Sequence, residues 1–445
     1  MNARVAIIGG GWAGLACAVE LSAAGVPVRV FEAAKQLGGR ARRVWIEGHA
    51  LDNGQHLLLG AYRETLRVMR LAGADPERLL QRLPLELAYP RDGFRFRLPR
   101  LPAPFHLAVG LLAARGCPPR EKLAAVRFIH ALRADGYRLA DEICVAELLD
   151  RHRQGGKLRR LGWEPLCLAA LNTPPALASA RVFARVLRDS LEGARENSDL
   201  LLPRVDLGRV FPDTATRFVA AHGGEIRLSA RVEHVAWPLA IDGERFDHAV
   251  IATAPQHAAG LLRGHAETSG LAAMLDAYRF EPIGTVYLAY PHSFHPPFPM
   301  LGMSGPLGQW VFDRGLQEET GGIAGCVLSA QGAWDERDND ALAAALHGEL
   351  QETLGLALPD PDWHRVVRER RATFSCRPGL PRLPAKTALP GVWLAGDYVY
   401  ADYPATLEGA VRSGCRVARD IIDFDRAGGC GRLHEPSAQA ESGFS

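Results

Sequence analysis

The sequence predicts an α/β fold in which a Rossmann-like, discontinuous dinucleotide-binding domain is interleaved with a substrate domain made of a mixed sheet and helices. A continuous apolar run at residues 5–8 leads directly into a glycine-rich turn, as expected of a buried parallel strand that opens a nucleotide-binding unit. A second apolar run, at residues 391–395, ends in Gly-Asp far along the chain. The length of 445 residues leaves room for about two to three domains.

The composition excludes several classes of protein. Hydrophobic residues make up 47% and charged residues 23%, which excludes a mainly disordered, collagen-like or coiled-coil chain. The formal net charge of +2 gives no basic excess of the kind that nucleic-acid binding requires. Eight scattered cysteines without a CxxC pair indicate a reducing compartment, with neither a disulfide framework nor a zinc site. The sequence contains no run of 18 apolar residues that would predict a membrane span, so we expect a cytoplasmic protein.

The first element is a strand, turn and helix with a dinucleotide fingerprint. Residues 9–14 fit G-x-G-x-x-G through Gly9, Gly11 and Gly14, and a small-residue helix pattern follows at residues 15–24. Gly9 permits the tight turn, Gly11 lets a pyrophosphate approach the backbone, and Gly14 lets helix and strand pack closely. The N–H groups at the start of the helix then face the phosphates. The cofactor contacts expected from this turn are Gly9, Gly11, Trp12, Ala13 and Gly14.

A second strand, at residues 28–31, ends in Glu32. This glutamate follows the fingerprint at nearly the spacing of the acid that binds a ribose 2′-hydroxyl. An acid at this position disfavours NADP and leaves FAD and NAD open.

The residues of the next turn favour FAD over NAD, because they resemble a stretch of a known superfamily. Residues 32–41 resemble the E-x(5)-G-G-R-A stretch of the FAD-dependent amine oxidase and phytoene desaturase superfamily. In that superfamily the Gly-Gly-Arg turn runs along the flavin diphosphate, so the resemblance implies FAD and contacts from Gly39, Arg40 and Ala41. A guanidinium beside a phosphate is chemically sensible, because its fork of N–H groups matches the phosphate oxygens.

Later segments fit the same domain. Residues 230–235 and 246–255 have the pattern of a strand pair, and the superfamily places an apolar contact near the adenine, here Val232. The strand at residues 391–395 leads to Gly396 and Asp397, and the resemblance puts this aspartate on the ribitol. A helix pattern follows Pro404, and its N-terminus, with Thr406 and Leu407, can present N–H groups to a flavin carbonyl. Only one fingerprint is visible, so an external reductant or oxidant is expected.

Three further stretches, at residues 52–62, 171–174 and 372–379, narrow the resemblance. With the Gly-Asp and Pro-Ala-Thr-Leu-Glu-Gly-Ala segments, they are similar to the squalene-associated FAD-dependent desaturases, a family understood as the hydroxysqualene dehydroxylases of bacterial squalene and hopanoid synthesis. Carotenoid desaturases have a D-x-G-P-like turn where this chain reads Asp52-Asn53-Gly54-Gln55-His56. The Gln-His pair favours the dehydroxylase family.

The resemblance implies reductive removal of an allylic hydroxyl from a C30 isoprenoid, hydroxysqualene, to give squalene. An acid protonates the leaving oxygen, water departs, and the N5 atom of the reduced flavin delivers hydride to the allylic cation. The protein would supply a long, dry, apolar tunnel. A functional link to squalene-synthase-like enzymes is implied as well.

The same turn supplies the candidate catalytic groups, His56 and Asp52, beside the cofactor contacts Gly54, Gln55 and His56 itself. An equally good interpretation is that Asp52 and His56 only hydrogen-bond the loop. Three other functions stay open: a carotenoid-type desaturase running hydride transfer the other way, a flavin amine oxidase, and a non-enzymatic prenyl carrier. An amine oxidase would want a flavin-facing lysine, and none of the four lysines stands in such a setting.

The predicted division of the chain follows from these segments. Residues 1–70, 200–260 and 385–425 form the FAD-binding domain, residues 71–199 and 261–384 form the substrate domain with a helical cap, and residues 426–445 are a disordered tail. Within the substrate domain we expect mostly helices between residues 105 and 200, with helical spacing from 122 to 151, short strands between 280 and 330, and a helix at 340–355.

Two segments allow more than one interpretation. Four arginines between residues 91 and 100 precede an apolar run at residues 101–112, which predicts either a contact with an anionic membrane or a loop followed by a core helix. His292 and His295 have the spacing of metal ligands, but they lack a further acidic or Cys partner, so no metal is expected.

Overall fold

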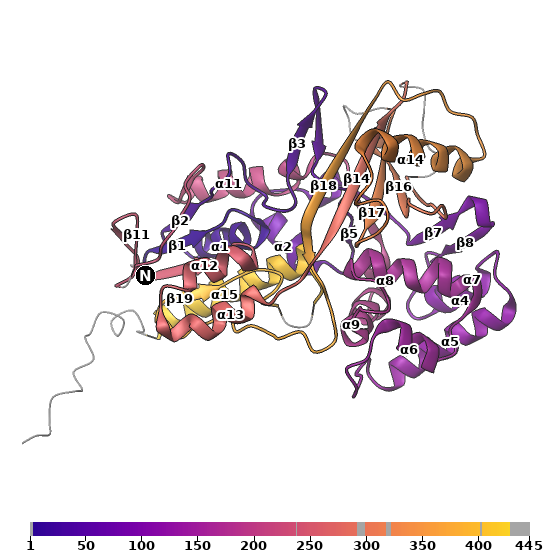
Figure 1. Cartoon of the computed structure of the whole chain (residues 1–445). Helices are drawn as coiled ribbons and strands as arrows, with labels where there is room; N and C mark the ends of the chain where they lie inside the picture. The colour runs from indigo at the N-terminus through magenta and orange to yellow at the C-terminus, as the bar shows by residue number, and fades with distance from the viewer. Residues whose placement is uncertain (1–2, 237, 292–298, 317–321, 401–402, 428–445) are drawn as a thin grey trace, which may run out of the picture.

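The computed structural model describes residues 3–236, 238–291, 299–316, 322–400 and 403–427. The histidine pair at 292 and 295, and the predicted tail beyond residue 427, lie outside the described residues. Figure 1 shows a unit built on a parallel sheet at the left, a group of helices at the lower right, and an antiparallel sheet with its own helix at the upper right.

The first unit is a five-stranded parallel sheet whose central strand is the first in the chain. The strand order is β10 (Glu225–Arg227), β2 (Val28–Phe31), β1 (Val5–Ile8), β13 (His248–Ile251) and β19 (Val392–Leu394). Strands β1 and β13 are buried along their whole length, as continuous apolar runs of a sheet covered on both faces should be. All five strands come from the three ranges expected for the FAD-binding domain.

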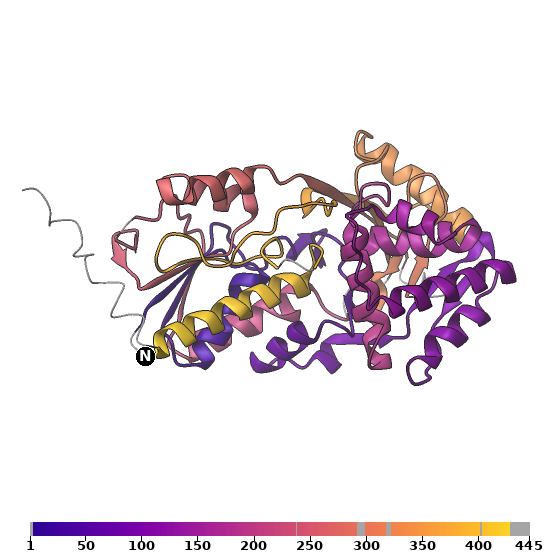
Figure 2. The same cartoon turned by 90° about the horizontal axis from the view of Figure 1, so that it is seen from below.

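Alternate residues of these strands face two different helical layers. Val5 and Ile7 pack with α1 (Trp12–Ala23), α11 (Pro212–Ala221) and α15 (Leu407–Arg426). Ala6 and Ile8 pack on the other side with α12 (Pro255–Leu262) and α13 (Ser269–Asp276). Figure 2 shows these two layers below and above the sheet. Because the strands are parallel, the residues that follow them meet at one edge of the sheet.

Of the strand pair expected at residues 230–235 and 246–255, the second strand is confirmed and the first is wrong. β13 lies within the second segment, but residues 230–235 form no strand, and the sheet ends instead at β10. The chain leaves the sheet after β10 because Ser229 adopts φ +52°, and it then passes along the carboxyl edge, where the Ala230 N–H donates to the Glu32 carbonyl. A short hairpin follows, formed by β11 (Ala240–Ile241) and β12 (Glu244–Arg245).

The second unit contains a five-stranded antiparallel sheet. Its order is β15 (Met300–Gly302), β16 (Trp310–Asp313), β17 (Ile323–Ser329), β14 (Phe280–Ala289) and β18 (Trp363–Phe374). Helix α14 (Asn339–Leu354) covers one face, where Leu342, Leu346 and Leu350 pack against Val286 and Leu328. The strands expected between residues 280 and 330 and the helix expected at 340–355 are therefore confirmed.

The helices expected between residues 105 and 200 are present as well. They are α4 (Phe105–Ala113), α5 (Pro119–Ala134), α6 (Val145–Arg151), α7 (Gly156–Leu158), α8 (Glu164–Leu171) and α9 (Ala180–Leu191). The helical pattern at residues 122–151 is divided between α5 and α6, because Gly136 and Tyr137 both adopt positive φ and end the first helix. None of the described helices is both long enough and apolar enough to cross a membrane.

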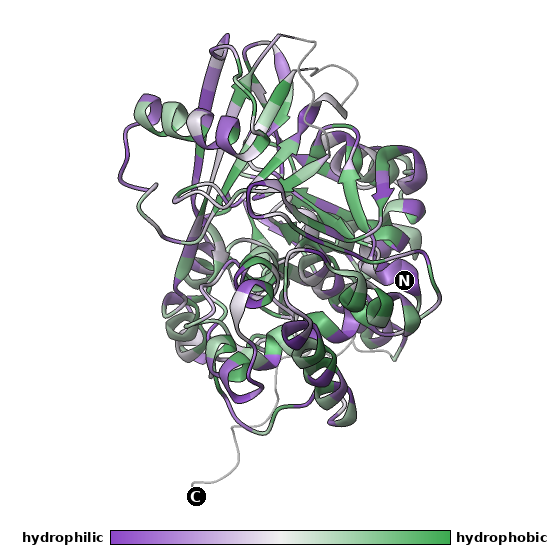
Figure 3. Cartoon of the chain, turned by 90° about the vertical axis from the view of Figure 1, so that its right-hand side faces the viewer, coloured by the Kyte–Doolittle hydropathy of each residue, from purple (hydrophilic) through white to green (hydrophobic). Residues whose placement is uncertain are grey.

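Short elements join the two units. A three-stranded sheet pairs β9 (Leu200–Pro203) with both β5 (Leu58–Leu59) and β6 (Leu80–Leu83), and so crosses the domain boundary expected near residue 70. The other connecting elements are β3 (Arg43–Ile46), β4 (His49–Asp52), α2 (Arg63–Leu71), α3 (Pro76–Leu79), β7 (Glu86–Tyr89), β8 (Phe94–Arg97) and α10 (Leu207–Val210). Figure 3 shows largely hydrophobic strands in the interior and hydrophilic residues on the outer turns of the helices.

Candidate active site

One cavity of about 970 Å³ runs from the carboxyl edge of the parallel sheet to the antiparallel sheet. This size is at the upper end for a small-molecule site. Every residue that the sequence predicts to contact the cofactor lines this cavity, with the exception of Gly14. Of the two candidate catalytic residues, His56 lines it and Asp52 does not.

The glycine-rich turn closes one side of the cavity. Gly9 adopts φ +111°, and a Cβ there would lie 2.8 Å from the Ala252 carbonyl oxygen. A Cβ on Gly14 would lie 2.0 Å from the Gly9 carbonyl oxygen, so this glycine keeps α1 close to its strand. Gly11, in contrast, has no atom nearer than 3.9 Å to such a position. The open space beside Gly11 and the start of α1 is what a pyrophosphate needs.

Glu32 is held in a fixed position at the end of β2. One carboxylate oxygen accepts a hydrogen bond of 2.7 Å from the Gly10 N–H, and the other accepts one of 2.8 Å from the Ala34 N–H. The carboxylate lies on the cavity wall, where the motif expects the ribose.

The side chains of Trp12 and Asn53 hydrogen-bond the Gly-Gly-Arg turn to the neighbouring loops of the site. The Trp12 indole N–H donates to the Ala41 carbonyl at 3.0 Å. The Asn53 amide accepts from the Arg42 N–H and donates to the Arg40 carbonyl, both at 3.0 Å. The three loops that follow β1, β2 and β4 are therefore joined into one rigid wall.

Arg40 and Asp397 form an ion pair on the wall of the cavity. The Arg40 Nη2 atom lies 2.7 Å from both carboxylate oxygens of Asp397, and Nη1 donates to the Ala372 carbonyl at 2.9 Å. Asp397 also accepts from the Tyr398 N–H at 3.0 Å. Thr406 caps α15 by accepting from the Gly409 N–H at 3.1 Å, which brings the start of this helix to the same wall.

His56 has a defined tautomer. Its Nδ1 atom lies 2.8 Å from the Gly54 carbonyl oxygen. Because a carbonyl only accepts, Nδ1 carries the hydrogen and Nε2 is left as an acceptor. Burial lowers the pKa of His56 to about 4, against the opposing effect of the Gly54 hydrogen bond. The imidazole is therefore neutral at physiological pH and can accept a hydrogen bond in the cavity.

Asp52 lies behind the cavity wall. Its carboxylate is fully buried and accepts from the Leu207 N–H at 2.8 Å and from Arg314 Nη2 at 3.0 Å. Arg314 also donates to the Gln55 side-chain oxygen at 2.6 Å. Burial raises the pKa of Asp52 to about 6, and Arg314 opposes this shift. Asp52 thus acts on the cavity only through Arg314 and Gln55, and not by contact with a ligand.

The nucleotide end of the cavity holds polar atoms that the sequence patterns missed. Thr253 Oγ1 and Gln256 Oε1 are buried and have no hydrogen-bond partner among the described residues. Both residues line the cavity near Val232 and follow β13 into α12. Buried polar atoms without a hydrogen-bond partner, in residues that line a cavity, fit a ligand that brings polar groups of its own. Their only sequence signal is their place just after a buried strand.

The opposite end of the cavity is apolar. It lies between helices α8 and α9 and strands β7, β16 and β17, where the described walls carry no charged side chain. The apolar residues here include Leu87, Leu166, Leu187, Trp310, Phe312 and Val327. None of the four lysines lines any part of the cavity. Gln55 and His56 lie between this apolar arm and the cofactor contacts, because the preceding Asn53 bonds to Arg40 and Gln55 accepts from Arg314, which directly follows β16.

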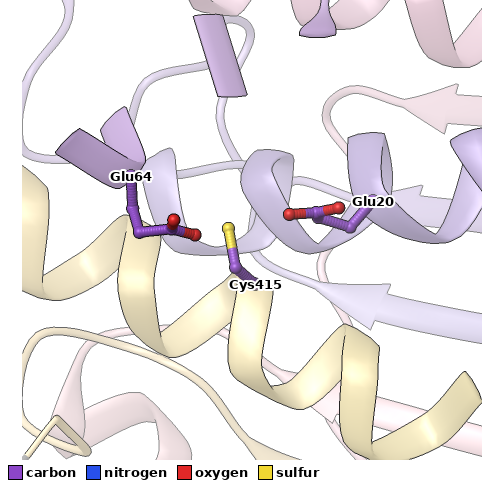
Figure 4. A group of neighbouring side chains, drawn as sticks. All are labelled: Glu20, Glu64 and Cys415. Carbon is purple, nitrogen blue, oxygen red and sulfur yellow. The ribbon is translucent and has the colours of Figure 1, made fainter. Parts of the chain in front are cut away.

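Outside the cavity, Glu20, Glu64 and Cys415 gather where α1, α2 and α15 meet, as Figure 4 shows. Three such ligand atoms could hold a metal ion. The Arg67 guanidinium already occupies this place: its Nη2 atom bonds to Glu20, lies 3.0 Å from Glu64 and lies 3.7 Å from Cys415 Sγ. Arg419 adds a second cation, 2.7 Å from Glu64. The acidic charges are thus balanced by arginine.

The sequence profile of the flavin containing amine oxidoreductases matches residues 12–422. The chain belongs to this family. Its cofactor is FAD, and it is an oxidoreductase. The predicted cofactor is thereby confirmed, and Gly9, Gly11, Glu32, Arg40 and Asp397 surround a cavity whose orphaned polar atoms fit such a group.

Within this family, the chain is similar to enzymes that act on long isoprenoids, according to their names. Hydroxysqualene dehydroxylases from Sinorhizobium fredii and Rhodopseudomonas palustris are 29% and 28% identical to this chain, over 94% and 96% of it and 98% and 100% of their own length. A zeta-carotene desaturase from Arabidopsis thaliana is 23% identical over 94% of this chain and 85% of its own. The resemblance to the hydroxysqualene dehydroxylases, stated from the sequence, is confirmed.

Solved structures confirm the predicted amine-oxidase-like fold class. An oxidoreductase from Methanosarcina mazei superimposes with a TM-score of 0.70 at 13% identity, covering 94% of this chain and all of that one. At that identity the likeness concerns the fold alone.

Proposed function

We propose that the protein is an FAD-dependent hydroxysqualene dehydroxylase that converts hydroxysqualene to squalene. The observation that carries the proposal is a single cavity with two kinds of wall, one polar and suited to FAD and the other apolar and uncharged, which meet at Gln55 and His56. The names of the two most similar relatives reported above support the same substrate.

The apolar arm suits the substrate chain. A long hydrocarbon gains about 0.8 kcal/mol for each CH₂ group that it buries. Walls without charged side chains avoid the cost of desolvating a charge and keep water from the reacting carbon. When bound in its reduced form, FAD supplies the hydride that replaces the hydroxyl group.

The polar residues at the junction would orient the hydroxyl. His56 Nε2 accepts from the hydroxyl hydrogen, since its Nδ1–H is already engaged with Gly54. The Gln55 side-chain oxygen is engaged with Arg314, so its NH₂ group is left to donate to the leaving oxygen. Asp52, the other candidate catalytic residue, would hold Arg314 in position instead.

The overall conversion consumes one proton and one hydride and releases water. The proposed protein therefore needs an external reductant for FAD, because one dinucleotide fingerprint is present in the sequence. We also propose that it works in the bacterial cytoplasm, at the inner face of the membrane, and receives its substrate from a squalene-synthase-like enzyme.

The decisive experiment is anaerobic incubation of the purified protein with reduced FAD and hydroxysqualene, followed by identification of the product by mass spectrometry. Squalene formation in a single turnover supports the proposal, and its absence with FAD bound contradicts it. In the same assay, His56→Ala should slow squalene formation at least about tenfold, the worth of one buried hydrogen bond. An unchanged rate with FAD still bound would remove His56 from the proposed site.

A desaturase is the second candidate, because a zeta-carotene desaturase aligns over nearly the whole chain. It would transfer hydride from an isoprenoid to oxidised FAD. Incubation with phytoene and oxidised FAD separates the two, since a dehydroxylase yields no desaturated carotene.

A further inference from the structure

Helix α4 turns a stripe of large apolar side chains toward solvent. Phe105 is 63% exposed and Leu112 is 61% exposed, and Leu101 and Val109 lie on the same stripe. The spacing of Phe105, Val109 and Leu112 places them on one side of the helix, and Leu101 lies in the segment just before it. Leu123 of the neighbouring helix α5 extends the stripe. Half of the large hydrophobic residues that are exposed in the described part of the chain lie here, so they form a patch and not a random scatter.

The opposite side of α4 already packs against the protein. Leu107 and Leu111 are buried in the main hydrophobic core, and a Cβ on Gly110 would lie 2.8 Å from Leu98. His106 Nε2 lies 3.3 Å from Ser198 Oγ, and Ser198 lines the cavity. The stripe therefore lies on the outer side of the wall that encloses the cavity.

The surroundings of the stripe are basic. Residues 91–127 contain eight arginines and lysines and two acidic residues, in a chain whose formal net charge is only +2. Among them, Arg100, Arg115, Arg120 and Arg127 are exposed and form no ion pair within the described part of the chain. Basic side chains beside an exposed apolar helical face are complementary to anionic lipid headgroups above hydrocarbon.

We propose that this basic apolar face, formed by α4, the start of α5 and their flanking arginines, docks on the surface of an anionic lipid bilayer. Phe105 and Leu112 enter the boundary between headgroups and acyl chains, and the four exposed arginines contact the lipid phosphates. The inference deepens the proposed function, because a bilayer is where an apolar C30 substrate resides. The contact itself depends only on the surface and not on the reaction.

The test is co-sedimentation of the FAD-loaded protein with vesicles. We expect binding to vesicles of equal parts phosphatidylcholine and phosphatidylglycerol, at least about tenfold weaker binding to phosphatidylcholine alone, and weakening by salt. Leu112→Asp and the pair Arg115→Glu and Arg127→Glu should each reduce binding at least about tenfold. Leu356→Asp and the pair Arg217→Glu and Arg245→Glu are matched controls, since Leu356 is 59% exposed on another face.

Equal binding by all variants, or no binding by the wild type, overturns the proposal. Self-association that Leu112→Asp abolishes, seen by analytical ultracentrifugation without vesicle binding, assigns the face to a second copy of the chain and overturns it too. Flavin absorbance and circular dichroism confirm that each variant is folded. Squalene formation from detergent-dispersed hydroxysqualene separates the two proposals, because a docking variant should keep this activity even when vesicle binding is lost.

Discussion

Arg40 and Asp397, which are 357 positions apart in the chain, form an ion pair on the wall of the cofactor cavity, with both carboxylate oxygens 2.7 Å from the same guanidinium nitrogen. The pair joins the turn after β2 to the turn after β19. Charge-assisted hydrogen bonds of this kind contribute about 1.5–3 kcal/mol each. Arg40→Lys keeps the charge but loses the second nitrogen, which donates to the Ala372 carbonyl, so we expect FAD to dissociate about ten- to a hundredfold more readily. Titration of the apoprotein with FAD, followed by flavin fluorescence, measures this change.

Arg245→Lys is the control for this substitution, because Arg245 is exposed and lies outside the cavity. The control should bind FAD as the wild type does. Equal affinity of Arg40→Lys and the wild type would mean that the pair does not support the cofactor.

His56 should make stability depend on pH in acid solution. Burial lowers its pKa to about 4 in the folded protein, below the ordinary 6.5. Between these values the unfolded chain binds a proton that the folded protein excludes, so this contribution to stability is complete above pH 6.5 and is lost as the pH falls toward 4. The free energy of unfolding should therefore fall less between pH 7 and pH 4.5 for His56→Gln than for the wild type, as urea denaturation can measure. Parallel curves would contradict the buried neutral imidazole.

The buried pair of Asp52 and Arg314 gives a third prediction. Arg314→Met leaves the Asp52 carboxylate buried without its cation, which should destabilise the fold by about 3–5 kcal/mol. Adding Asp52→Asn removes the charge and should restore more than half of this loss. Thermal unfolding of both variants checks the coupling, and additive effects would show that the two side chains do not depend on each other.

Replacing Gly14 tests the close contact between α1 and its strand. In Gly14→Ala the new Cβ would lie 2.0 Å from the Gly9 carbonyl oxygen, so the turn must move, at a cost of about 1–3 kcal/mol or more. We expect weaker FAD binding and a lower melting temperature. Gly348→Ala is the matched control: this glycine lies within α14 with no atom near its Cβ position, so alanine should raise helix stability.

The melting temperature should depend on the arginine at the cluster of Glu20, Glu64 and Cys415, and not on a metal ion that a chelator could remove. Because Arg67 bonds to all three, EDTA should leave the melting temperature unchanged, and Arg67→Met should lower it. A fall in melting temperature on adding EDTA to the wild type, reversed by a divalent cation, would show that a metal shares the cluster.

Local patterns were enough to predict the parts of the site in which sequence and backbone geometry are directly coupled. Gly9 needs a positive φ, and Gly14 needs to lack a Cβ, so both can be recognised from the chain alone. Glu32 follows a strand in which three of the four residues are apolar, and its place at the sheet edge follows from that strand. Thr406 precedes a strongly periodic helix and caps it.

Contacts between distant segments could not be predicted in this way. Arg314 follows β16 in no recognisable motif, yet it sets the orientation of Gln55. Asp52 is close to His56 in sequence, which made it a catalytic candidate, but it is the last residue of β4 and its carboxylate is held by the Leu207 N–H and Arg314, which no local pattern indicates. The strand expected at residues 230–235 failed for a related reason: its alternation reflects a segment that lines a cavity and not one that pairs in a sheet.

The strand order of the parallel sheet has a consequence for biosynthesis. β1, which is made before the other strands, pairs directly with β13, and β13 pairs with β19 from near residue 392. A nascent chain therefore holds four of the five strands until β19 and α15 emerge from the ribosome, and it has no complete place for the flavin before then. Loading of the cofactor must therefore follow the emergence of α15, and truncation ahead of this helix should yield a colourless product.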